Sequence, residues 1–541
     1  MKGTALLAVF AVSAALAAPQ TIRVALPPQT NVTFLIPITP ASDTTLVNFQ
    51  AISLLYKPLL YLNAKQQVDY ARSVASSVKT RNGRTYTITL NPKWRWSDGQ
   101  PVTARDVAFD FALLRSIGNS QASQDGNFGI GGIPNAIAKV KVTGNYSLQV
   151  ELTRAYNPSW FILNGLSQIY PLPAQAWNHD PASPAKTLAY LQRLGGTPSF
   201  LMGSPVDGPF KLSGWHPDRG FSFSVNPTYA GHPADYHKLD LVYFTSSDAE
   251  FNALKVSQVQ VGYLPTHLLS AGKLSGYRLV STPSWAMNFV ALNFAKAKAL
   301  RSLAVRQALQ MAIDQPTQIS QIYHGYAGPQ YGPVPPQPPT YLSPKLAGGA
   351  VPYPYDPAKG KQLLLKSGWK LQGGVMAKGG SKLSFNLDYP SGSVVSRTQA
   401  ELLAADAKKE GISLQLRPQP QSVVDAEYAN PKGWTMILSI DWTYGPYPSG
   451  YGIFDPQGGS DLEGFDDPKM SALTLKTHAF GTSAQQQAAM NAYQDYAAQV
   501  LPALYLPNAD ILGEFATSLK GVARNDDLAT GVWAPQRWSY R

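Results

Sequence analysis

An α/β fold, divided between two or three lobes or domains, is the fold class that this sequence predicts. The chain of 541 residues is several times longer than one typical hydrophobic core requires. Patterns typical of helices and of strands alternate along most of it, as they do in α/β proteins. Hydrophobic residues make up 44% of the sequence and aromatic residues 11%, which is enough to bury large cores.

The first residues of the chain indicate export. Lys2 precedes a largely apolar run over residues 5–16, and small side chains stand at Ala15 and Ala17, which predicts a cleavable signal peptide over residues 1–17. The apolar run is shorter than the ~20 residues that span a bilayer. The sequence has no cysteine, which excludes disulfides, thiolate metal sites, cysteine nucleophiles and a lipidated N-terminal cysteine. We therefore expect a periplasmic or extracellular protein.

The formal net charge of +12 comes from a shortage of acidic residues rather than from basic clusters. Lysine and arginine are spread thinly, with no run longer than two, whereas nucleic-acid-binding proteins gather them on one surface. We therefore expect no nucleic-acid partner. Charged residues make up only 14% of the sequence, and this low charge density with a basic balance favours the hypothesis of an acidic exterior.

The N-terminal part of the chain alternates between strand and helix patterns. Residues 21–26 and 84–90 carry apolar side chains at every second position and predict strands. Residues 50–63 predict a short helix that is broken near Pro58.

The segment KWRWSDGQPVTARDVAFDF, residues 93–111, has a structural explanation throughout. Its two tryptophans share one parity and would lie on one face if the preceding strand continues. A Ser-Asp-Gly turn follows, and Thr103 with Asp106 resembles a capping box for a helix that runs to Leu114. This segment is therefore predicted to be scaffold.

Strands and capped helices continue through the rest of the chain. Residues 145–152, 210–215 and 220–226 predict strands, of which the last two form a hairpin. The further predicted elements are a helix that begins at Pro357 after Asp356 as N-cap and ends before Gly368, a helix over 398–412 that stops at Gly411, and a strand over 413–419.

An amphipathic helix is predicted over residues 300–314. Its apolar stripe is expected to hold Leu303, Ala304, Ala308 and Met311. The ten prolines that follow between residues 329 and 357 predict an extended surface connection within one lobe.

No pattern in the sequence is typical of catalysis or of a metal site. Ser-x-x-Lys occurs in four scattered copies without the partner motifs of penicillin-interacting enzymes, and Gly-x-Ser-x-Gly does not occur. The one near pair of histidines, His232 and His237, has a spacing that suits neither a helix face nor a zinc motif. We therefore expect no catalytic residue, no metal ligand and no cofactor. A secreted serine hydrolase or transpeptidase stays open as the alternative from the enzyme class.

Aromatic residues are concentrated in DWTYGPYPSGYG, residues 441–452. The loop follows an apolar strand, TMILSI, that is expected to be central in a sheet. Rings with polar tips on such a loop suit a ligand wall, because they offer a large contact area with few rotatable bonds. An aromatic corner that packs only for structure is the alternative.

Several segments, in order along nearly the whole chain, together resemble one family: the peptide/nickel-type extracellular solute-binding proteins of family 5, which serve ABC importers. The segments are KWRWSDGQPVTARDVAFDF (93–111), GPFKLSGWHPDRGFSFSVNPTYAG (208–231), FVALNFAKAKALRSLAVRQALQMAIDQPTQISQIYHGYAGP (289–329) and YPYDPAKGKQLLLKSGW (353–369). The resemblance implies a periplasmic-binding-protein type II fold with two lobes, a hinge and a three-domain, cluster C-like architecture.

The resemblance also implies how the chain is divided. Domain I would be discontinuous, over residues 18–45, 195–283 and 511–541. Domain II would be an insertion over 46–194, and domain III would cover 284–510. Ligand would be buried between domains I and III as they close.

The function that the resemblance implies is transport without catalysis. A monomeric binding protein would capture peptides or peptide-like solutes and deliver them to the membrane permease of an ABC importer. Oligosaccharides, which stack on Trp and Tyr rings, stay open as another ligand class. A nickel chelate is less favoured, because the chain has seven histidines and no cysteine.

One position departs from the pattern of the peptide-binding members, which place an aspartate after the tryptophan of the domain III loop to pair with the peptide's α-amino group. Gly445 stands at that position here, and Asp441 lies four residues earlier. This departure counts against recognition of a free N-terminus by the family's usual contact. The candidate ligand-binding residues are Trp442, Tyr444, Asp441, Gly445, Tyr447, Trp285, Asn288 and Thr33, the last in the loop over 27–34 after the first strand.

Overall fold

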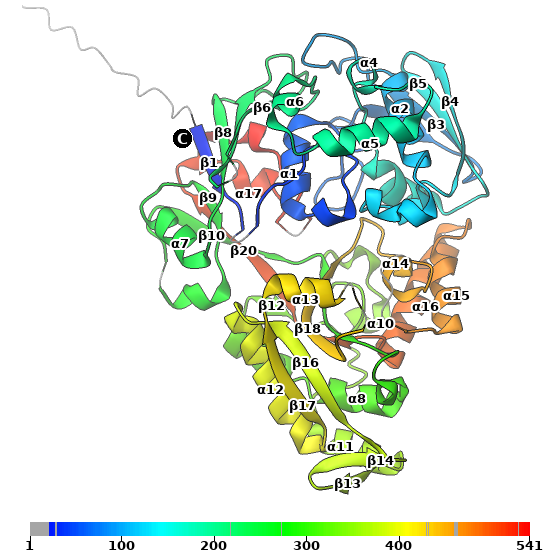
Figure 1. The fold of residues 1–541 in the computed structure, drawn as a ribbon, viewed down its shortest axis with the longest axis vertical. Helices are drawn as coiled ribbons and strands as arrows, with labels where there is room; N and C mark the ends of the chain where they lie inside the picture. Colours follow the sequence, from blue (N-terminus) through cyan, green and yellow to red (C-terminus); the bar gives the residue numbers. More distant parts are fainter. Residues whose placement is uncertain are drawn as a thin grey trace, which may run out of the picture.

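The computed structural model shows two lobes that are in direct contact, one above the other in Figure 1. It describes residues 21–27, 30–216, 218–271, 273–428, 430, 432–458, 464–528 and 530–540. The expected signal peptide over 1–17 lies outside the described residues. Among the described helices, none is both long and apolar enough to cross a membrane.

The upper lobe in Figure 1 is built on an eight-stranded sheet that joins distant parts of the chain. The N-terminal strand β1 (Thr21–Ala25) pairs in parallel with β8 (Lys238–Val242) and β9 (Val261–Tyr263). Strand β20 (Asn508–Ala516), close to the C-terminus, pairs with β9 and with β10 (Tyr277–Pro283). The remaining strands are β6 (Phe210–His216), β7 (Gly220–Val225) and β12 (Ala327–Gly328). The hairpin predicted over 210–226 is confirmed by the antiparallel pairing of β6 with β7.

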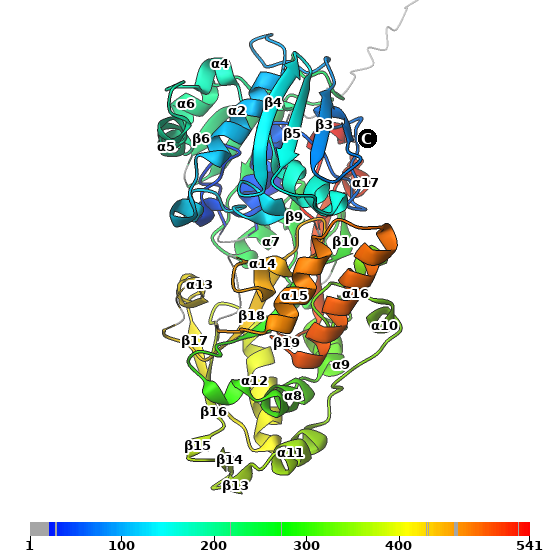
Figure 2. The same ribbon diagram turned by 90° about the vertical axis from the view of Figure 1, so that its right-hand side faces the viewer.

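A second, antiparallel sheet lies in the same lobe, in the order β2-β3-β5-β4. Figure 2 shows helix α2 packed beside this sheet, next to β4. Helix α2 (Ala104–Arg115) begins with the predicted capping box between Thr103 and Asp106, and Trp94 and Trp96 are buried before it. The prediction that this segment is scaffold is therefore confirmed. The strands are β2 (Ala75–Lys79), β3 (Thr85–Leu90), β4 (Ile137–Gly144) and β5 (Ser147–Leu152).

Short helices cover the upper lobe. Helix α1 (Leu46–Leu55) ends before Pro58, so the predicted break is confirmed, but the predicted extent of 50–63 is wrong because the described residues 58–63 are not helical. Side chains of α1 line a cavity between the lobes. The others are α3 (Pro158–Trp160), α4 (Ala174–Trp177), α5 (Pro184–Leu194), α6 (Pro198–Gly203), α7 (Ser247–Lys255) and α17 (Val522–Asn525), with the small strands β21 (Leu519–Lys520) and β22 (Ser539–Tyr540).

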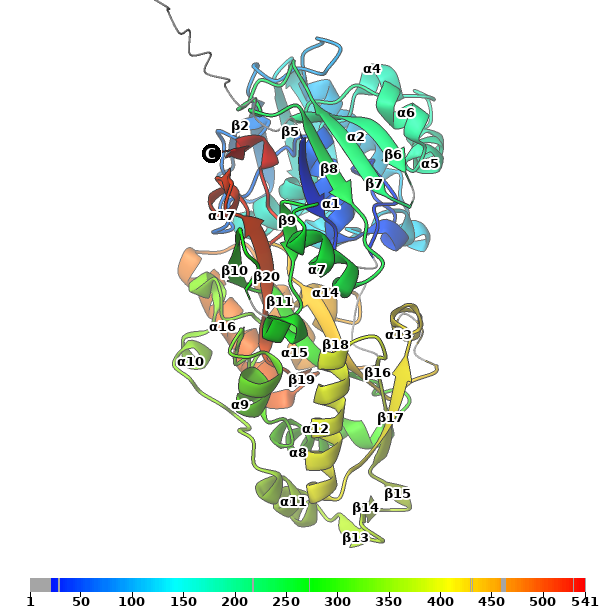
Figure 3. The same ribbon diagram turned by 90° about the vertical axis from the view of Figure 1, so that its left-hand side faces the viewer.

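The lower lobe is built on a five-stranded mixed sheet in the order β17-β16-β18-β11-β19. Strand β18 (Met436–Thr443) is central, as its apolar sequence predicts, and pairs with β16 (Ser384–Pro390) on one side and β11 (Ala286–Leu292) on the other. Long helices pack around this sheet (Figure 3). The other elements of the lobe are β17 (Ser413–Gln419), β19 (Leu504–Tyr505), β13 (Lys370–Gln372), β14 (Val375–Lys378), β15 (Ser381–Lys382), α8 (Leu303–Met311), α9 (Gln315–Thr317), α10 (Pro344–Ala347), α11 (Pro357–Lys366), α12 (Val394–Glu410), α13 (Gln421–Tyr428), α14 (Tyr451–Phe454), α15 (Pro468–Thr477) and α16 (Ser483–Val500).

The predicted caps of two lower-lobe helices are confirmed, but the predicted stripe of α8 is partly wrong. Asp356 accepts a hydrogen bond from the Lys359 backbone at the start of α11, and Gly411 ends α12 with φ 84°. In α8, Leu303 is 39% exposed, whereas Val305, Ala308 and Leu309 are buried. The helix begins only at Leu303, so its first turn lies beside solvent and its buried face is centred further along the chain.

The chain passes between the lobes at two neighbouring places, each of which joins a strand of the upper sheet to a strand of the lower sheet. The chain passes from β10 of the upper sheet to β11 of the lower sheet through residues 284–285, and returns from β19 to β20 through residues 506–507. The two passages are hydrogen-bonded to each other: the Ser284 N–H donates to the Ala509 carbonyl at 3.3 Å, and Asn508 Nδ2 donates to the Ala286 carbonyl at 2.8 Å. The lobes are therefore joined at a hinge of two adjacent passages, and β12 pairs with β20 beside it.

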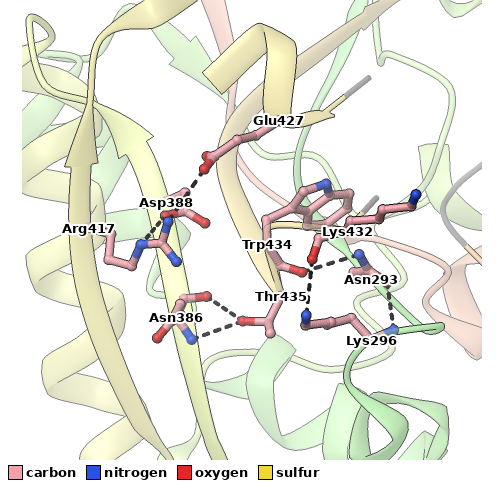
Figure 4. Close-up of polar contacts among 9 residues, drawn as sticks. All are labelled: Asn293, Lys296, Asn386, Asp388, Arg417, Glu427, Lys432, Trp434 and Thr435. Atoms are coloured by element: carbon pink, nitrogen blue, oxygen red, sulfur yellow. Dashed lines mark hydrogen bonds and ion pairs between the residues drawn. The ribbon is translucent and has the colours of Figure 1, made fainter. Parts of the chain in front are cut away.

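Figure 4 shows a polar network that ties α13 to the lower sheet. Arg417 on β17 forms an ion pair with Asp388 on β16, with 2.9 Å between Nε and Oδ1, and a longer one of 3.4 Å with Glu427 on α13. Asp388 is fully buried, and burial raises its pKa to about 6 although the Arg417 charge opposes the shift. Arg417 is the cation that both carboxylates share, and it holds α13 against the sheet, so we interpret the network as structural.

Replacing the cation of this network should expose its role. Arg417→Met is expected to lower the free energy of unfolding by about 2 kcal/mol at pH 8, because Asp388 loses its partner in the protein interior. The loss should shrink at pH 5, where the Asp388 carboxyl is protonated. Urea unfolding at both pH values measures it, with Arg219→Met as the matched control, since Arg219 pairs with Asp218 on the exposed surface. An equal loss at both pH values would contradict the interpretation.

Candidate functional site

A cavity of about 570 Å³ lies between the lobes. Its upper wall comes from α1, from the segment 57–62 that follows it, and from residues 530–536 near the C-terminus. Its lower wall comes from residues 443–446, directly after β18. A volume of this size suits a small-molecule or short-peptide ligand.

The register of β11 against β18 decides which predicted residues share a face. Asn288 lies opposite Asp441, and Met287 lies opposite Trp442, in an antiparallel pair whose successive side chains alternate. Asp441 and Asn288 therefore share one face of the sheet, and Trp442 is on the other. A Cβ added to Gly452 of α14 would lie 3.3 Å from the Trp442 ring, and Trp442 does not line the cavity.

Asp441 and Asn288, which share one face of the lower sheet, both have oxygen atoms that are free to accept further hydrogen bonds. Asp441 is accessible to water, yet the surrounding protein desolvates it enough to raise its pKa to about 6. Asn288 is buried, and its Oδ1 has no hydrogen-bond partner among the described residues. Neither residue lines the 570 Å³ cavity.

The aromatic residues of the loop differ in their surroundings. Tyr444 lines the cavity and packs edge-on against Trp285, with 6.5 Å between ring centroids. Trp285 is buried and donates from Nε1 to the Gly445 carbonyl at 3.3 Å, which holds the loop in place. Tyr447 is buried, and its hydroxyl accepts a hydrogen bond from Asn157 Nδ2 at 3.0 Å.

Gly445 lines the cavity and has a close neighbour from the opposite lobe. A Cβ at this position would lie 2.9 Å from Oδ1 of Asn164. Asn164 uses that oxygen to accept from the Tyr447 backbone N–H at 2.8 Å, and its Nδ2 donates to the Tyr447 carbonyl at 2.8 Å. The space that an aspartate would need at position 445 is therefore occupied by the Asn164 amide.

Asn164 belongs to a larger interlobe contact, which we define as Asn157, Asn164 and Trp160 of the upper lobe with Tyr447 and His478 of the lower lobe. The Asn157 N–H donates to the His478 carbonyl at 2.8 Å, and the imidazole stacks on Trp160 with ring centroids 4.2 Å apart. Burial lowers the pKa of His478 to about 3, so its ring is neutral in this contact. The interlobe contact must break if the lobes separate.

Removing the central amide of this contact tests its strength. Asn164→Ala leaves the buried peptide groups of Tyr447 without partners, at a cost of about 1.5–3 kcal/mol. We expect the variant to populate separated lobes, seen as a larger radius of gyration by small-angle X-ray scattering. Asn135→Ala, which removes an exposed amide within the upper lobe, is the matched control. An unchanged scattering profile for Asn164→Ala would show that other contacts hold the lobes together.

Thr33 lies outside the cavity. Its hydroxyl donates to Asp43 Oδ1 at 2.6 Å and its backbone N–H donates to Asn48 Oδ1 at 3.0 Å. These bonds order the loop that follows β1, of which residues 28–29 are outside the described residues.

Most residues that line the cavity are absent from the predicted set, and two of them are polar side chains that are almost fully buried. Lys57 is 5% exposed, and Asn164 is 7% exposed. Lys57 interrupts the apolar run LLYKPLLYL, and a lone charge in such a run is a signal that the sequence did contain. Asn164 has no comparable signal, because its partners are nearly 300 residues away in the chain.

The described residues that line the cavity are mostly uncharged. Lys57 is the one charged side chain among the described residues that line it, and no nucleophile and base are paired there. Among the described residues, no group of three or more His, Asp or Glu side chains is placed to hold a metal ion. Enclosure of a ligand is what this geometry supports.

Comparison with known proteins gives a consistent result. The family model described as bacterial extracellular solute-binding proteins, family 5 middle region, matches residues 70–463, more than half of the chain. Protein XP55 of Streptomyces lividans is 26% identical over 375 residues, which cover 69% of this chain and 63% of that relative, less than two thirds of its length. The oligopeptide-binding protein AppA of Bacillus subtilis is 26% identical over 416 residues, covering 74% of this chain and 70% of AppA. The structure of AppA with a nonapeptide superposes with a TM-score of 0.78 at 19% identity, over 97% of this chain and all of AppA, which confirms the predicted fold class.

Proposed function

The chain belongs to the bacterial extracellular solute-binding proteins of family 5, and from that membership we propose that it captures a peptide or peptide-like solute between its lobes for an ABC importer. The observation that carries the proposal is the cavity between the lobes, walled by α1 from above and by the loop after β18 from below. The solute would then be delivered to a membrane permease. Catalysis has no part in the proposal.

The proposed mechanism is closure around the solute. Separated lobes admit the solute, and the closed form gains contacts that only a bound solute makes with both walls. The interlobe contact stabilises the closed form whether or not a solute is bound. The contacts with the solute therefore have to supply less of the free energy that favours closure. We propose that the protein works as an exported monomer, released from its signal peptide after Ala17.

We also propose the roles of the predicted residues. Tyr444 and Gly445 would touch the solute as cavity wall, and Asp441 with Asn288 would offer polar contacts beside it. Trp285 and Tyr447 would position the loop. Trp442 and Thr33 would act on the site only through their neighbours. The domain boundaries stay as predicted: 18–45 with 195–283 and 511–541, then 46–194, then 284–510.

A thermal-shift screen of the mature protein tests the proposed function. The ligands are di- to hexapeptides, the same peptides with acetylated N-termini, and oligosaccharides. A ligand at 100 times its Kd adds about 2.7 kcal/mol to the free energy of unfolding and raises the melting temperature by a few degrees. A shift with peptides of either kind supports the proposal. A shift with oligosaccharides alone would replace the solute class, and a serine-reactive probe that labels one residue stoichiometrically would overturn the binding-protein role.

A further inference from the structure

Lys57 holds an unusual position in the cavity between the lobes. It follows α1 directly, is 5% exposed, and is the one charged side chain among the described residues of the cavity wall. The rest of the wall consists of apolar side chains, hydroxyls, amides and backbone groups. A lysine is rarely buried without a partner, because moving an ammonium group out of water is costly.

The surroundings of the Lys57 ammonium supply rings but no anion within bonding distance. The Tyr61 and Trp94 ring centroids lie 5.2 and 5.3 Å from Nζ. In the described part of the chain, Nζ takes part in no hydrogen bond and no ion pair of 4 Å or less. Only the backbone N–H of Lys57 reaches Asp207, donating to Oδ1 at 2.9 Å. The ammonium therefore has bonding capacity left for a group in the cavity.

Asp207 does not remove that capacity. Its carboxyl is fully buried behind the cavity wall and forms no ion pair of 4 Å or less with the Lys57 ammonium, and burial raises its pKa although the Lys57 charge opposes the shift. Burial lowers the pKa of Lys57 to about 7. The other charged groups near Lys57 are Arg72, Lys93 and Asp69, of which the two cations repel its ammonium. An anion in the cavity would offset this desolvation and repulsion.

We propose that Lys57 is a specificity-determining residue that binds an anionic oxygen group of the solute, a carboxylate in the case of a peptide. The proposal rests on the proposed function and narrows it: the solute carries a negative charge beside an otherwise neutral body that fills the cavity. It also fits the lower wall, where Gly445 supplies no carboxylate to attract a cationic amine.

The proposal is tested by removing the charge from the protein and from the ligand in turn. Lys57→Met keeps the chain length of the side chain, and Lys93→Met is the matched control, because its ammonium lies 4.4 Å from the Trp94 ring but outside the cavity wall. The probes are acetyl-tetraalanine as the free acid, its C-terminal amide, 3-phenylpropionate as a carboxylate without a peptide backbone, and inorganic phosphate. Isothermal titration calorimetry measures Kd, and circular dichroism with thermal unfolding shows that the variants are folded.

The expected result is that the free acid binds wild type and Lys93→Met alike, and that Lys57→Met or the amide weakens binding about 10- to 100-fold. Wild-type affinity for the acid should also fall from pH 6 to pH 8.5, as Lys57 loses its proton, and Lys57→Met should lack this dependence.

The other outcomes separate this inference from the proposed function. Equal binding of acid and amide by wild type and Lys57→Met would overturn the inference and leave peptide binding standing. Binding of 3-phenylpropionate or phosphate, lost in Lys57→Met, without binding of either peptide would support the anion site and overturn the peptide. Binding of no probe by a folded wild type would overturn the inference, and the wider ligand screen would then decide the proposed function.

Discussion

The wild-type protein is expected to resist unfolding more strongly at pH 5 than at pH 8. Among the carboxyl groups that have no ion pair in the described part of the chain, desolvation raises the pKa of four to about 8 or 9: Asp207, Glu250 and Asp526 to about 8, and Glu410 to about 9. The folded chain keeps these protons above pH 4.5, where the unfolded chain releases them. The free energy of unfolding therefore falls as pH rises from about 5 towards 9.

Part of this fall in the free energy of unfolding is expected to come from Glu410, and a single substitution should remove that part. It is fully buried at the end of α12, and neither carboxyl oxygen has a hydrogen-bond partner among the described residues. The carboxyl group lies against Gly360 of α11, where an added Cβ would be 2.3 Å from Glu410 Oε1. Asp406 and Asp356 raise its pKa further by repulsion. Glu410→Gln is expected to raise the free energy of unfolding by a few kcal/mol at pH 8 and to leave it nearly unchanged at pH 5, since each pKa unit corresponds to about 1.4 kcal/mol.

Urea unfolding from pH 4 to pH 9 measures both effects. Glu401→Gln, on the exposed side of the same helix, is the matched control and should leave the pH dependence unchanged. Lys57 and His478 act in the opposite direction, because burial lowers their pKa values to about 7 and about 3. These two groups make the free energy of unfolding rise with pH, but between pH 5 and 8 their effect is smaller than the fall caused by the four carboxyl groups. Greater stability at pH 8 than at pH 5 would contradict the prediction, and with it the hypothesis of an acidic exterior.

Restoring an aspartate at position 445 is expected to abolish ligand binding rather than to create recognition of a free amine. In Gly445→Asp the new Cβ would lie 2.9 Å from Asn164 Oδ1, and the carboxylate would face an acceptor instead of a donor. The Asn164 amide must then leave the Tyr447 backbone, which separates the lobes. We expect affinity for any ligand found in the screen to fall at least about 100-fold, the equivalent of about 2.7 kcal/mol.

The double variant Gly445→Asp/Asn164→Ala makes this prediction specific. Truncating Asn164 removes the clash but also removes both hydrogen bonds to the Tyr447 backbone, so the double variant is expected to bind ligand no better than Gly445→Asp does. Recovered binding of peptides with a free N-terminus would show that the clash, and not the lost interlobe bonds, limits the single variant. Gly392→Asp, where a Cβ meets nothing within 4 Å, controls for the added charge. Unchanged ligand affinity in the single variant would show that position 445 does not limit the cavity.

Local patterns predicted most of the fold because caps, turns and alternation act within a few residues. The capping box at Thr103, the αL end of α12 at Gly411 and the central place of β18 all follow from such signals. The predicted apolar face of α8 was partly wrong because tertiary packing, rather than the local sequence, decides where that helix begins. The joining of β1, β9 and β20 in one sheet has no local signal, and it followed only from the family resemblance.

The site was less predictable because it is assembled across the lobes. The loop at 441–447 was recognised from its composition, and the structure places Tyr444 and Gly445 in the cavity wall. The β11–β18 register, which places Asn288 opposite Asp441, is a long-range pairing. Asn164 occupies the space beside Gly445 through contacts nearly 300 residues apart, which one sequence does not reveal.

The hinge made by the passages at 284–285 and 506–507 limits how the lobes can move. Two adjacent strands that are hydrogen-bonded across the joint resist sliding and twisting more than they resist bending. Bending at this joint changes the angle between the lobes, and a single donor–acceptor dye pair, with one dye on each lobe, would follow that angle through opening and closure. A permease that distinguishes the open from the closed form could do so by the angle at which the two lobes meet.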